Sequence, residues 1–367
     1  MKTKLNLIQT IRGLTAVTVV FRHVTVSSLA YFNVVWFYNI FRPSWNGVDI
    51  FFVLSGFIIT YIHYQDLVDK QHTEAFFIKR FTRIYPVFWI ISLIYLAVHL
   101  VSKKLAVHDV VSVYMAKSFL LLENANPMPI IRASWSLCFE VLFYLVFGLC
   151  IMLGMKAAKF IWAAWLVMTV LCYLFLPANK IPFVVRPYII EFLMWCLVGY
   201  IFKSITLGGN QFCWIKRNHR LILFSGLLLI LAMYIITNLT QYGQQTAFDS
   251  RIFYGLSASL LILGAALTDY SKPLEIPKIF LLLGDASYVI YLIHLLVLAF
   301  AFKSIQSYQA IYANHWLMIV FGFCAAATAV GMGVLFHLAV EKPVLKFLNK
   351  LSFKNKRANK NVALTDR

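Results

Sequence analysis

Acidic side chains are scarce in this sequence, and charged side chains of either sign are few. Asp and Glu together number 14, against 33 Lys and Arg, and charged residues make up 13% of the 367. Hydrophobic residues account for 61%, and the mean hydropathy is +0.78. The core of a soluble domain needs far less apolar surface than this. The composition therefore excludes an ordinary soluble protein and predicts a membrane protein.

Paired cysteines, internal repeats and a second soluble domain are also absent from the sequence. The six cysteines form no Cys-x-x-Cys pair and lack the spacing of metal ligands, so we interpret them as packing residues and predict no metal site. No segment recurs at a fixed period. The amino-terminal residues start with a basic stretch, but Arg12 and Gly13 interrupt the apolar run and no small-residue cleavage site follows. We therefore predict an uncleaved first span.

Ten segments are apolar and long enough to cross a bilayer, which takes about 20 residues of helix. They are residues 7–31, 48–64, 85–101, 135–153, 160–176, 184–202, 221–238, 252–267, 283–302 and 315–340. We predict an all-α polytopic membrane protein with about ten transmembrane helices, formed by one domain over residues 1–345 and followed by a basic tail, 346–367. The longest polar connection, 102–134, has the prolines and asparagines of a turn-rich outer loop.

The formal net charge of +19 is distributed in a way that indicates topology. Lys and Arg lie mostly at the ends of the apolar segments. They are more frequent in the connections that lie on the same side of the membrane as the amino terminus. Cytoplasmic loops favour Lys and Arg, so we predict that both termini are cytoplasmic. The same distribution argues against a nucleic-acid partner. The basic tail is expected to lie near anionic membrane lipid.

Basic groups interrupt the first span, IRGLTAVTVVFRHV. Arg12 and His23 are about 16 Å apart along a helix that rises 1.5 Å per residue, and their spacing brings them to nearly the same face. Arg12 lies toward the cytoplasmic side and His23 deeper. Arg22 lies on a different face, where we expect it to pair with a carboxylate such as Asp49 or Glu140.

Two carboxylates are predicted at the depth of His23. Asp49 in GVDIFFVLSGF begins the second span from the outer side, and Glu140 in SWSLCFEVLFY begins the fourth. Ionisable groups inside a bilayer cost free energy, so they tend to face one another, water or a ligand. These carboxylates and the imidazole of His23 are therefore candidates for one site.

A second set of ionisable groups is predicted nearer the inner side. Arg80 and Arg83 in FFIKRFTRIYP lie just before the third span and share one helix face. In the ninth span, Asp285 lies near the inner start and His294 near the middle. The predicted bundle thus has a positive inner mouth and a middle that contains histidine and carboxylate.

Most of these residues could also have a purely structural role, with no part in catalysis or ligand binding. Arg12 would extend to lipid headgroups, and the basic amphipathic segment with Arg80 and Arg83 would lie on the membrane surface. His294 would satisfy a polar contact between helices. His23 is hardest to explain in this way, because a deep imidazole on the face of Arg12 is costly unless it is used.

The residue types favour group transfer from a phosphate-containing donor. Arginine binds phosphate better than lysine because its guanidinium is a planar fork with several donors. Histidine takes a proton from a hydroxyl, or carries an acyl group as a nucleophile. Arginines at the inner side and a histidine further out therefore indicate transfer from a cytoplasmic donor to an acceptor at the outer side.

The chain resembles the acyltransferase-3 family of polytopic membrane acyltransferases, and more closely its exopolysaccharide and O-antigen O-acetyltransferase branch. The resemblance covers nearly the whole chain and rests on six stretches in order: IQTIRGLTAVTVVFRHV, GVDIFFVLSGFII, FFIKRFTRIYPVFW, SWSLCFEVLFYLVFG, GDASYVIYLIHLLVL and VEKPVLKFL. The first matches the family's pattern of Arg, ten residues and His, and the third its Arg-x-x-Arg element. Two features depart from the family. Gln9 stands near an acidic position of many members, and no hydrolase-like domain follows the tenth span.

The resemblance implies residue roles. His23 falls on the family's catalytic histidine, and Asp49 and Glu140 fall on acidic positions of the second and fourth spans. The arginines associated with the acyl-CoA donor correspond to Arg12, Arg80 and Arg83. We expect His23 to act as base or as transient acyl carrier, oriented by Glu140 or Asp49. The membrane domain would complete the transfer itself or pass the acyl group to a separate protein.

The predicted function is that of an O-acyltransferase of the bacterial inner membrane. It would move an acyl group, acetyl by the resemblance, from cytoplasmic acetyl-CoA to a hydroxyl of a saccharide acceptor that is polymeric or lipid-linked. The outer-loop residues expected to set acceptor specificity include Trp45, Asn124, Asn126 and Arg132. The alternative is a transporter or flippase of an anionic or saccharide substrate, with the same polar groups along a permeation path.

Overall fold

Every regular element in the described part of the chain is helical. The computed structural model describes residues 5–41, 46–102, 112–123, 128–240 and 248–350. Ten of its helices are long and apolar enough to cross a membrane, which confirms the predicted all-α architecture of ten spans. They are α1 (Asn6–Phe32), α2 (Asn46–Asp69), α3 (Thr73–Val101), α5 (Trp135–Leu153), α6 (Met155–Phe175), α7 (Tyr188–Thr206), α9 (His219–Thr240), α10 (Phe248–Ser271), α11 (Lys278–Ser304) and α13 (His315–Phe336).

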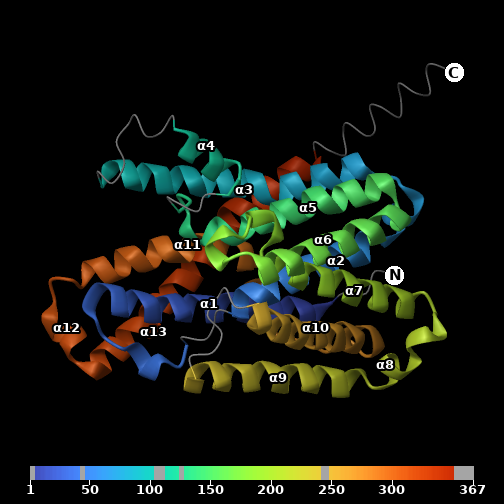
Figure 1. The fold of residues 1–367 in the computed structure, drawn as a ribbon. Coiled ribbons are helices and arrows are strands. Elements are labelled where there is room, and N and C mark those ends of the chain that lie inside the picture. The colour runs from blue at the N-terminus through green and yellow to red at the C-terminus, as the bar shows by residue number, and fades with distance from the viewer. Residues whose placement is uncertain (1–4, 42–45, 103–111, 124–127, 241–247, 351–367) are drawn as a thin grey trace.

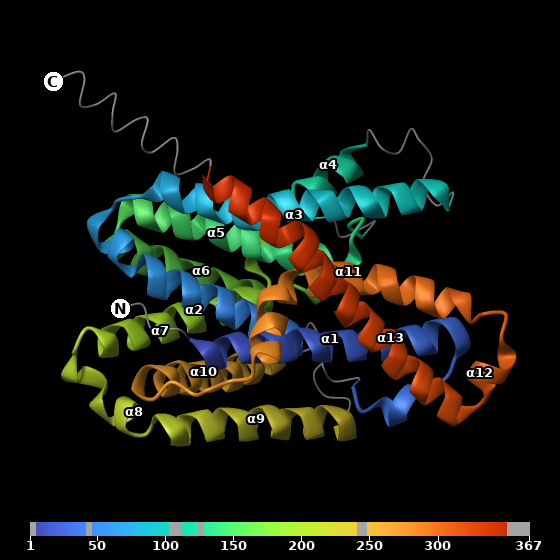
Figure 2. The same cartoon turned by 180° about the vertical axis from the view of Figure 1, so that it is seen from behind.

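Short helices occupy the connections. α4 (Val113–Phe119) lies in the long connection before α5, α8 (Cys213–Arg217) precedes α9, and α12 (Gln309–Ala313) precedes α13. The long helices run roughly side by side (Figure 1). The start of α1 and the end of α13 lie toward one end of the bundle and α12 lies at the other, as the view from behind also shows (Figure 2).

The third helix begins earlier than the sequence predicts. α3 starts at Thr73 rather than at residue 85, and it passes through Pro86 without ending. Arg80 and Arg83 therefore lie within the membrane-spanning helix and not in a segment before it. Their charges are tolerated there because both side chains face a cavity inside the bundle and not lipid.

The last helix also continues beyond its predicted end. After α13, residues His337–Glu341 form a π-helical turn, and the helix then runs on to Lys350, past the predicted start of the tail at residue 346. π-helical turns are rare in proteins, and those that occur are frequently found at functional sites. The turn places His337 and Glu341 in the interior, where both are buried.

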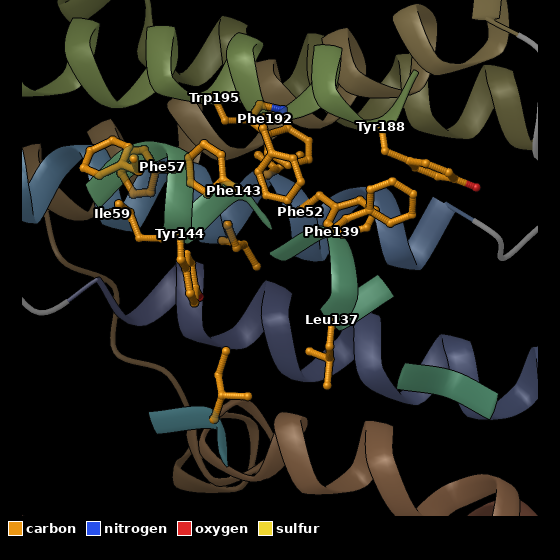
Figure 3. Packing of buried hydrophobic residues seen from close by; sticks show 14 of the residues in the cluster. Phe52, Phe57, Ile59, Leu137, Phe139, Phe143, Tyr144, Tyr188, Phe192 and Trp195 are labelled. Carbon is orange, nitrogen blue, oxygen red and sulfur yellow. The ribbon is translucent and has the colours of Figure 1, made fainter. Parts of the chain in front are cut away.

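Aromatic side chains form the centre of the larger core. Rings from α2, α5 and α7 pack together, and Phe143 stacks on Phe192 with their centroids 4.4 Å apart. Figure 3 shows this cluster, with Trp195 beside Phe192 and with Tyr144 pointing away from the other rings of α5. Tyr144 instead lines the cavity described below. The aromatic core is thus one wall of the candidate site.

A buried carboxylate of α10 caps the first helix. Asp269 is fully buried, and its Oδ2 accepts a hydrogen bond from the backbone N–H of Leu7 at 2.8 Å. The first N–H groups of a helix have no partner inside the helix, and a carboxylate satisfies them and opposes the helix dipole. This contact joins α10 to the start of α1.

Glycines allow α1 and α11 to approach closely. A Cβ added at Gly284 would lie 2.2 Å from the carbonyl oxygen of Gln9, and one added at Gly13 would lie 2.6 Å from the backbone nitrogen of Gly284. Small residues are the usual means by which membrane helices make such contacts. The backbone atoms on both sides leave no flexible group to move aside, so this crossing fixes the distance between the two helices.

Substitution of Gly284 by alanine is expected to destabilise the bundle. Forcing the two backbones apart costs about 1–3 kcal/mol, as overpacking in a core typically does. The measurement is the midpoint of thermal unfolding of purified protein in detergent. Gly331→Ala is the matched control, because a Cβ at Gly331 of α13 meets no described atom within 4 Å. An equal midpoint for both variants would contradict the packing argument.

Candidate active site

A cavity of about 210 Å³ lies between five of the long helices. Its apolar lining comes mainly from α2. Its polar lining comes from all five helices and consists of Arg12 of α1, Ser55 of α2, Arg80 and Arg83 of α3, Ser136, Glu140 and Tyr144 of α5, and Ser287, Tyr288 and Tyr291 of α11. The structure thus gathers the three predicted donor-binding arginines and Glu140 in one cavity.

Arg83 forms an ion pair with a buried carboxylate. Its Nη1 donates to Glu341 Oε1 at 2.9 Å, and the Arg83 side chain is 34% exposed while that of Glu341 is fully buried. His337 Nδ1 lies 2.6 Å from the other carboxylate oxygen of Glu341. The guanidinium of Arg83 also lies over the ring of Tyr288, 5.7 Å from its centroid. These contacts limit the positions that Arg83 can take.

Arg80 lies between aromatic rings and a buried histidine. Its guanidinium carbon is 5.8 Å from the ring centroids of both Phe76 and Tyr144, and its Nη2 lies 3.4 Å from His63 Nε2. The Nε atom of Arg80 is buried and has no hydrogen-bond partner among the described residues. A buried donor of this kind costs free energy unless it is paired, which favours an anionic ligand here.

Glu140 belongs to the same cavity as the arginines. Its Oε1 accepts hydrogen bonds from Ser55 Oγ at 2.8 Å and from the hydroxyl of Tyr144. Three guanidinium groups and the carboxylate of Glu140 line the cavity, and the buried carboxylate of Glu341, outside the lining, pairs with Arg83. The excess of positive charge favours binding of an anion.

His23 lies beside a second histidine. The rings of His23 and His294 have their centroids 4.9 Å apart, and His294 is fully buried. His294 Nδ1 donates to the carbonyl of Ile290 at 3.1 Å, because a carbonyl can only accept. In the neutral ring, Nε2 therefore keeps its lone pair, and it has no partner within the described part of the chain.

A tyrosine connects the histidine pair to the cavity. The ring of Tyr291 lines the cavity and lies 5.9 Å from the ring of His294, centroid to centroid. The Tyr291 hydroxyl donates to the carbonyl of Ala133 at 2.8 Å and contacts Ser136 Oγ at 2.8 Å. His23 itself does not line the cavity. Two neighbouring side chains, Tyr291 and His294, lie between His23 and the cavity.

Asp49 has other partners than His23. It is buried and forms an ion pair with Arg251 of α10, whose Nη1 also lies 3.7 Å from Glu191 Oε1 of α7. The predicted eighth span begins at residue 252, but α10 begins earlier, at Phe248, and Arg251 is buried inside it. This cluster ties α2, α7 and α10 together, with the guanidinium 4.5 Å from the ring centroid of Tyr188.

The remaining predicted residues lie elsewhere in the bundle. Arg22 is buried on α1, and Asp285 of α11 accepts a hydrogen bond from Gln9 Nε2 at 2.5 Å, next to the glycine crossing. Arg132 is exposed at the start of a short 3₁₀ turn before α5. Trp45, Asn124 and Asn126 lie outside the described residues.

Several residues of the site are not among the sequence candidates. They are His63, Asp66, Tyr144, Tyr288, Tyr291, His337 and Glu341. An acidic residue in an otherwise apolar segment is the signal that could have identified Glu341, which stands in VEKPVLKFL at the end of the last span. The tyrosines give no such signal, since tyrosine is common in membrane helices near the interface.

The ten-helix bundle and the arginine-lined cavity together indicate the class of protein. They describe a polytopic membrane protein that can bind an anionic group inside the bundle, with a histidine pair next to the binding cavity. The family model described as an acyltransferase domain matches residues 6–337. The chain belongs to this family, acyltransferase-3, and is a membrane acyltransferase.

Three curated proteins illustrate the relationship. ORF330 of Acidianus two-tailed virus, named as a presumed acetyltransferase, is 25% identical over 78% of this chain and 81% of its own length. The acyltransferase MdmB of Streptomyces mycarofaciens is 26% identical over 83% of this chain and 81% of its own. The exopolysaccharide production protein ExoZ of Rhizobium meliloti is 25% identical over 82% of this chain and 89% of its own. No solved structure matches.

Proposed function

We propose that this acyltransferase moves an acetyl group from acetyl-CoA to a hydroxyl of a cell-surface or lipid-linked saccharide. The observation that carries the proposal is the meeting of Arg12, Arg80 and Arg83 in one cavity, two side chains away from His23. A CoA donor is a polyanion, which this charge distribution favours. The saccharide acceptor is supported by the name of the relative ExoZ, an exopolysaccharide production protein.

The side chains divide the reaction between them. Arg12, Arg80 and Arg83 bind the phosphates of the donor at the inner side, which we propose to be the cytoplasmic side of a bacterial inner membrane with both termini cytoplasmic. His23 takes the proton of the acceptor hydroxyl, or first accepts the acetyl group itself. In either route a C–O bond of the new ester replaces the C–S bond of the thioester, and the CoA sulfur leaves with one proton.

His294 and Tyr291 have supporting roles in this scheme. Because Nδ1 of His294 donates to the carbonyl of Ile290, the lone pair of the neutral ring is on Nε2, and this ring lies beside that of His23. While it stays neutral, this ring adds no positive charge beside His23 as His23 takes a proton. The acetyl group would pass Tyr291, whose ring lines the cavity and lies 5.9 Å from that of His294, centroid to centroid. No contact in the cavity specifically favours the transporter alternative.

The proposal is tested with purified protein reconstituted in lipid and incubated with radiolabelled acetyl-CoA. We expect release of CoA and transfer of label to an added polysaccharide. Label that stays on the protein without acceptor would identify an acyl-enzyme, and CoA binding without label would identify direct transfer. If folded protein neither binds CoA nor releases it, the proposal is wrong, and flux of a saccharide into vesicles without donor consumption would then identify a transporter.

A further inference from the structure

A buried histidine and an aspartate lie behind Arg80, at the end of α2. His63 is 2% exposed, and its Nδ1 lies 2.6 Å from Asp66 Oδ2. Its Nε2 lies 3.4 Å from Nη2 of Arg80 on the neighbouring helix α3. His72 also contacts Asp66, at 3.0 Å, but its side chain is 65% exposed. Of the two histidines, only His63 connects Asp66 to the cavity.

The hydrogen bonds define the protonation of His63. A carboxylate only accepts, so the Nδ1 that contacts Asp66 carries the proton. Arginine only donates, so the Nε2 that faces Arg80 carries the lone pair. His63 is therefore a neutral imidazole that accepts from the guanidinium. One nitrogen of Arg80 faces His63, its Nε is buried with no partner among the described residues, and the residue lines the cavity.

We propose that His63 and Asp66 form a positioning pair that orients Arg80 for donor binding, so that donor affinity depends on His63 being neutral. This inference rests on the proposed function. Asp66 holds the imidazole in one tautomer, and the imidazole holds the guanidinium in one orientation. Pre-ordering a side chain in this way raises affinity because less conformational entropy is lost when the ligand binds.

Protonation of His63 removes its hydrogen bond with Arg80 and adds an unfavourable charge beside the guanidinium. The imidazolium has no lone pair to accept from Arg80, and it places a second positive charge beside the guanidinium. The charged and titratable groups that face His63 are Asp66 on its own helix and Arg80 and Lys79 on α3. α5 contributes Tyr144, whose ring centroid lies 5.8 Å from the guanidinium carbon of Arg80. Donor affinity should therefore fall as the pH is lowered through the range in which this imidazole gains its proton.

Two substitutions separate positioning from simple packing. Gln has a carbonyl oxygen that can accept from Arg80 and an amide that can donate to Asp66, but it does not titrate. Leu fills similar space and can do neither. His63→Gln should therefore keep the orientation of Arg80 and lose its pH dependence, whereas His63→Leu should lose the orientation at every pH.

The experiment measures binding of CoA to the full-length protein in detergent by calorimetry, from about pH 4.5 to 8, a range that includes the ordinary histidine pKa and extends well to its acid side. For wild type we expect the dissociation constant to rise about fivefold to tenfold toward the acid end, the size of one charge-assisted contact. His63→Gln should stay within about twofold of wild type at neutral pH with most of that rise abolished, and His63→Leu should bind about tenfold more weakly throughout.

The control is His72→Gln, which removes the exposed histidine that shares Asp66 without contacting Arg80. It should match wild type in both affinity and pH profile. The inference is wrong if His63→Gln keeps the wild-type pH profile, or if folded His63→Leu binds CoA as wild type does. If His63→Leu does not fold, the profile of His63→Gln decides alone. Wild-type protein that binds no CoA at any pH would instead overturn the proposed function, and the inference with it.

Discussion

Replacement of His23 by alanine is expected to lower the turnover number for acetyl transfer by about 10²–10⁴-fold, the usual contribution of a positioned general base. The reason is the location of His23 beside a buried histidine of fixed tautomer, and apart from the arginines of the cavity. Because His23 does not line the cavity, CoA affinity should change by less than about twofold, the pattern of a residue that acts in the transition state. The measurements are steady-state kinetics and CoA binding.

The control for this prediction is His99→Ala. His99 is another histidine of a membrane-spanning helix whose Nδ1 contacts the carbonyl four residues earlier, Tyr95, at 2.7 Å. It does not line the cavity, so both turnover and CoA affinity should stay near wild type. Full turnover in folded His23→Ala protein would exclude His23 as base or acyl carrier. Loss of CoA binding in the same variant would place His23 in the donor site instead.

Replacement of Arg83 by alanine is expected to weaken CoA binding and to destabilise the fold. Loss of one charge-assisted contact to phosphate is worth about 1.5–3 kcal/mol, which is about tenfold to a hundredfold in affinity. The same substitution leaves the fully buried carboxylate of Glu341 without its guanidinium. Breaking a fully buried pair from one side costs about 3–5 kcal/mol, and the cost here is smaller because Arg83 is 34% exposed and Glu341 keeps its contact with His337. Calorimetric CoA binding and the thermal unfolding midpoint measure the two effects.

A double variant separates these two effects. Arg83→Met with Glu341→Gln removes both charges and restores balance in the interior, so its unfolding midpoint should recover relative to Arg83→Ala. Its CoA affinity should stay low, because the guanidinium is still missing. Arg220→Ala is the control for net charge, since Arg220 is exposed at the start of α9. Wild-type affinity in the double variant would show that Arg83 has only a structural role.

The sequence predicts the helices well because each one is a local property of the chain. A stretch of about 20 apolar residues has to form a helix in lipid, where every backbone polar group needs a partner. The same argument misplaces the first residues of α3 and α10, which both begin earlier than predicted. Arg80, Arg83 and Arg251 lie outside the predicted spans, yet all three lie inside membrane-spanning helices because the bundle supplies polar surroundings for them.

The candidate site is predicted in part. The sequence assigns different depths to Arg12 and Glu140, yet both side chains line one cavity in the structure. Asp49 and His23 are predicted at one depth, but equal depth does not make two side chains neighbours. Asp49 faces α10 and pairs with Arg251, whereas His23 faces α11 and contacts His294.

By itself the sequence determined that this protein is an all-helical membrane bundle of ten spans, and that ionisable residues such as Arg12 and Glu140 lie inside it. Hydropathy and helical periodicity are sufficient for that, since both depend only on neighbouring residues. Only the tertiary structure decided which of these residues meet. The partnerships of Arg83 with Glu341, of Arg80 with His63 and of His23 with His294 depend on how each helix is rotated and how closely it packs. Packing across the whole bundle, including the glycine crossing of α1 and α11, sets those quantities.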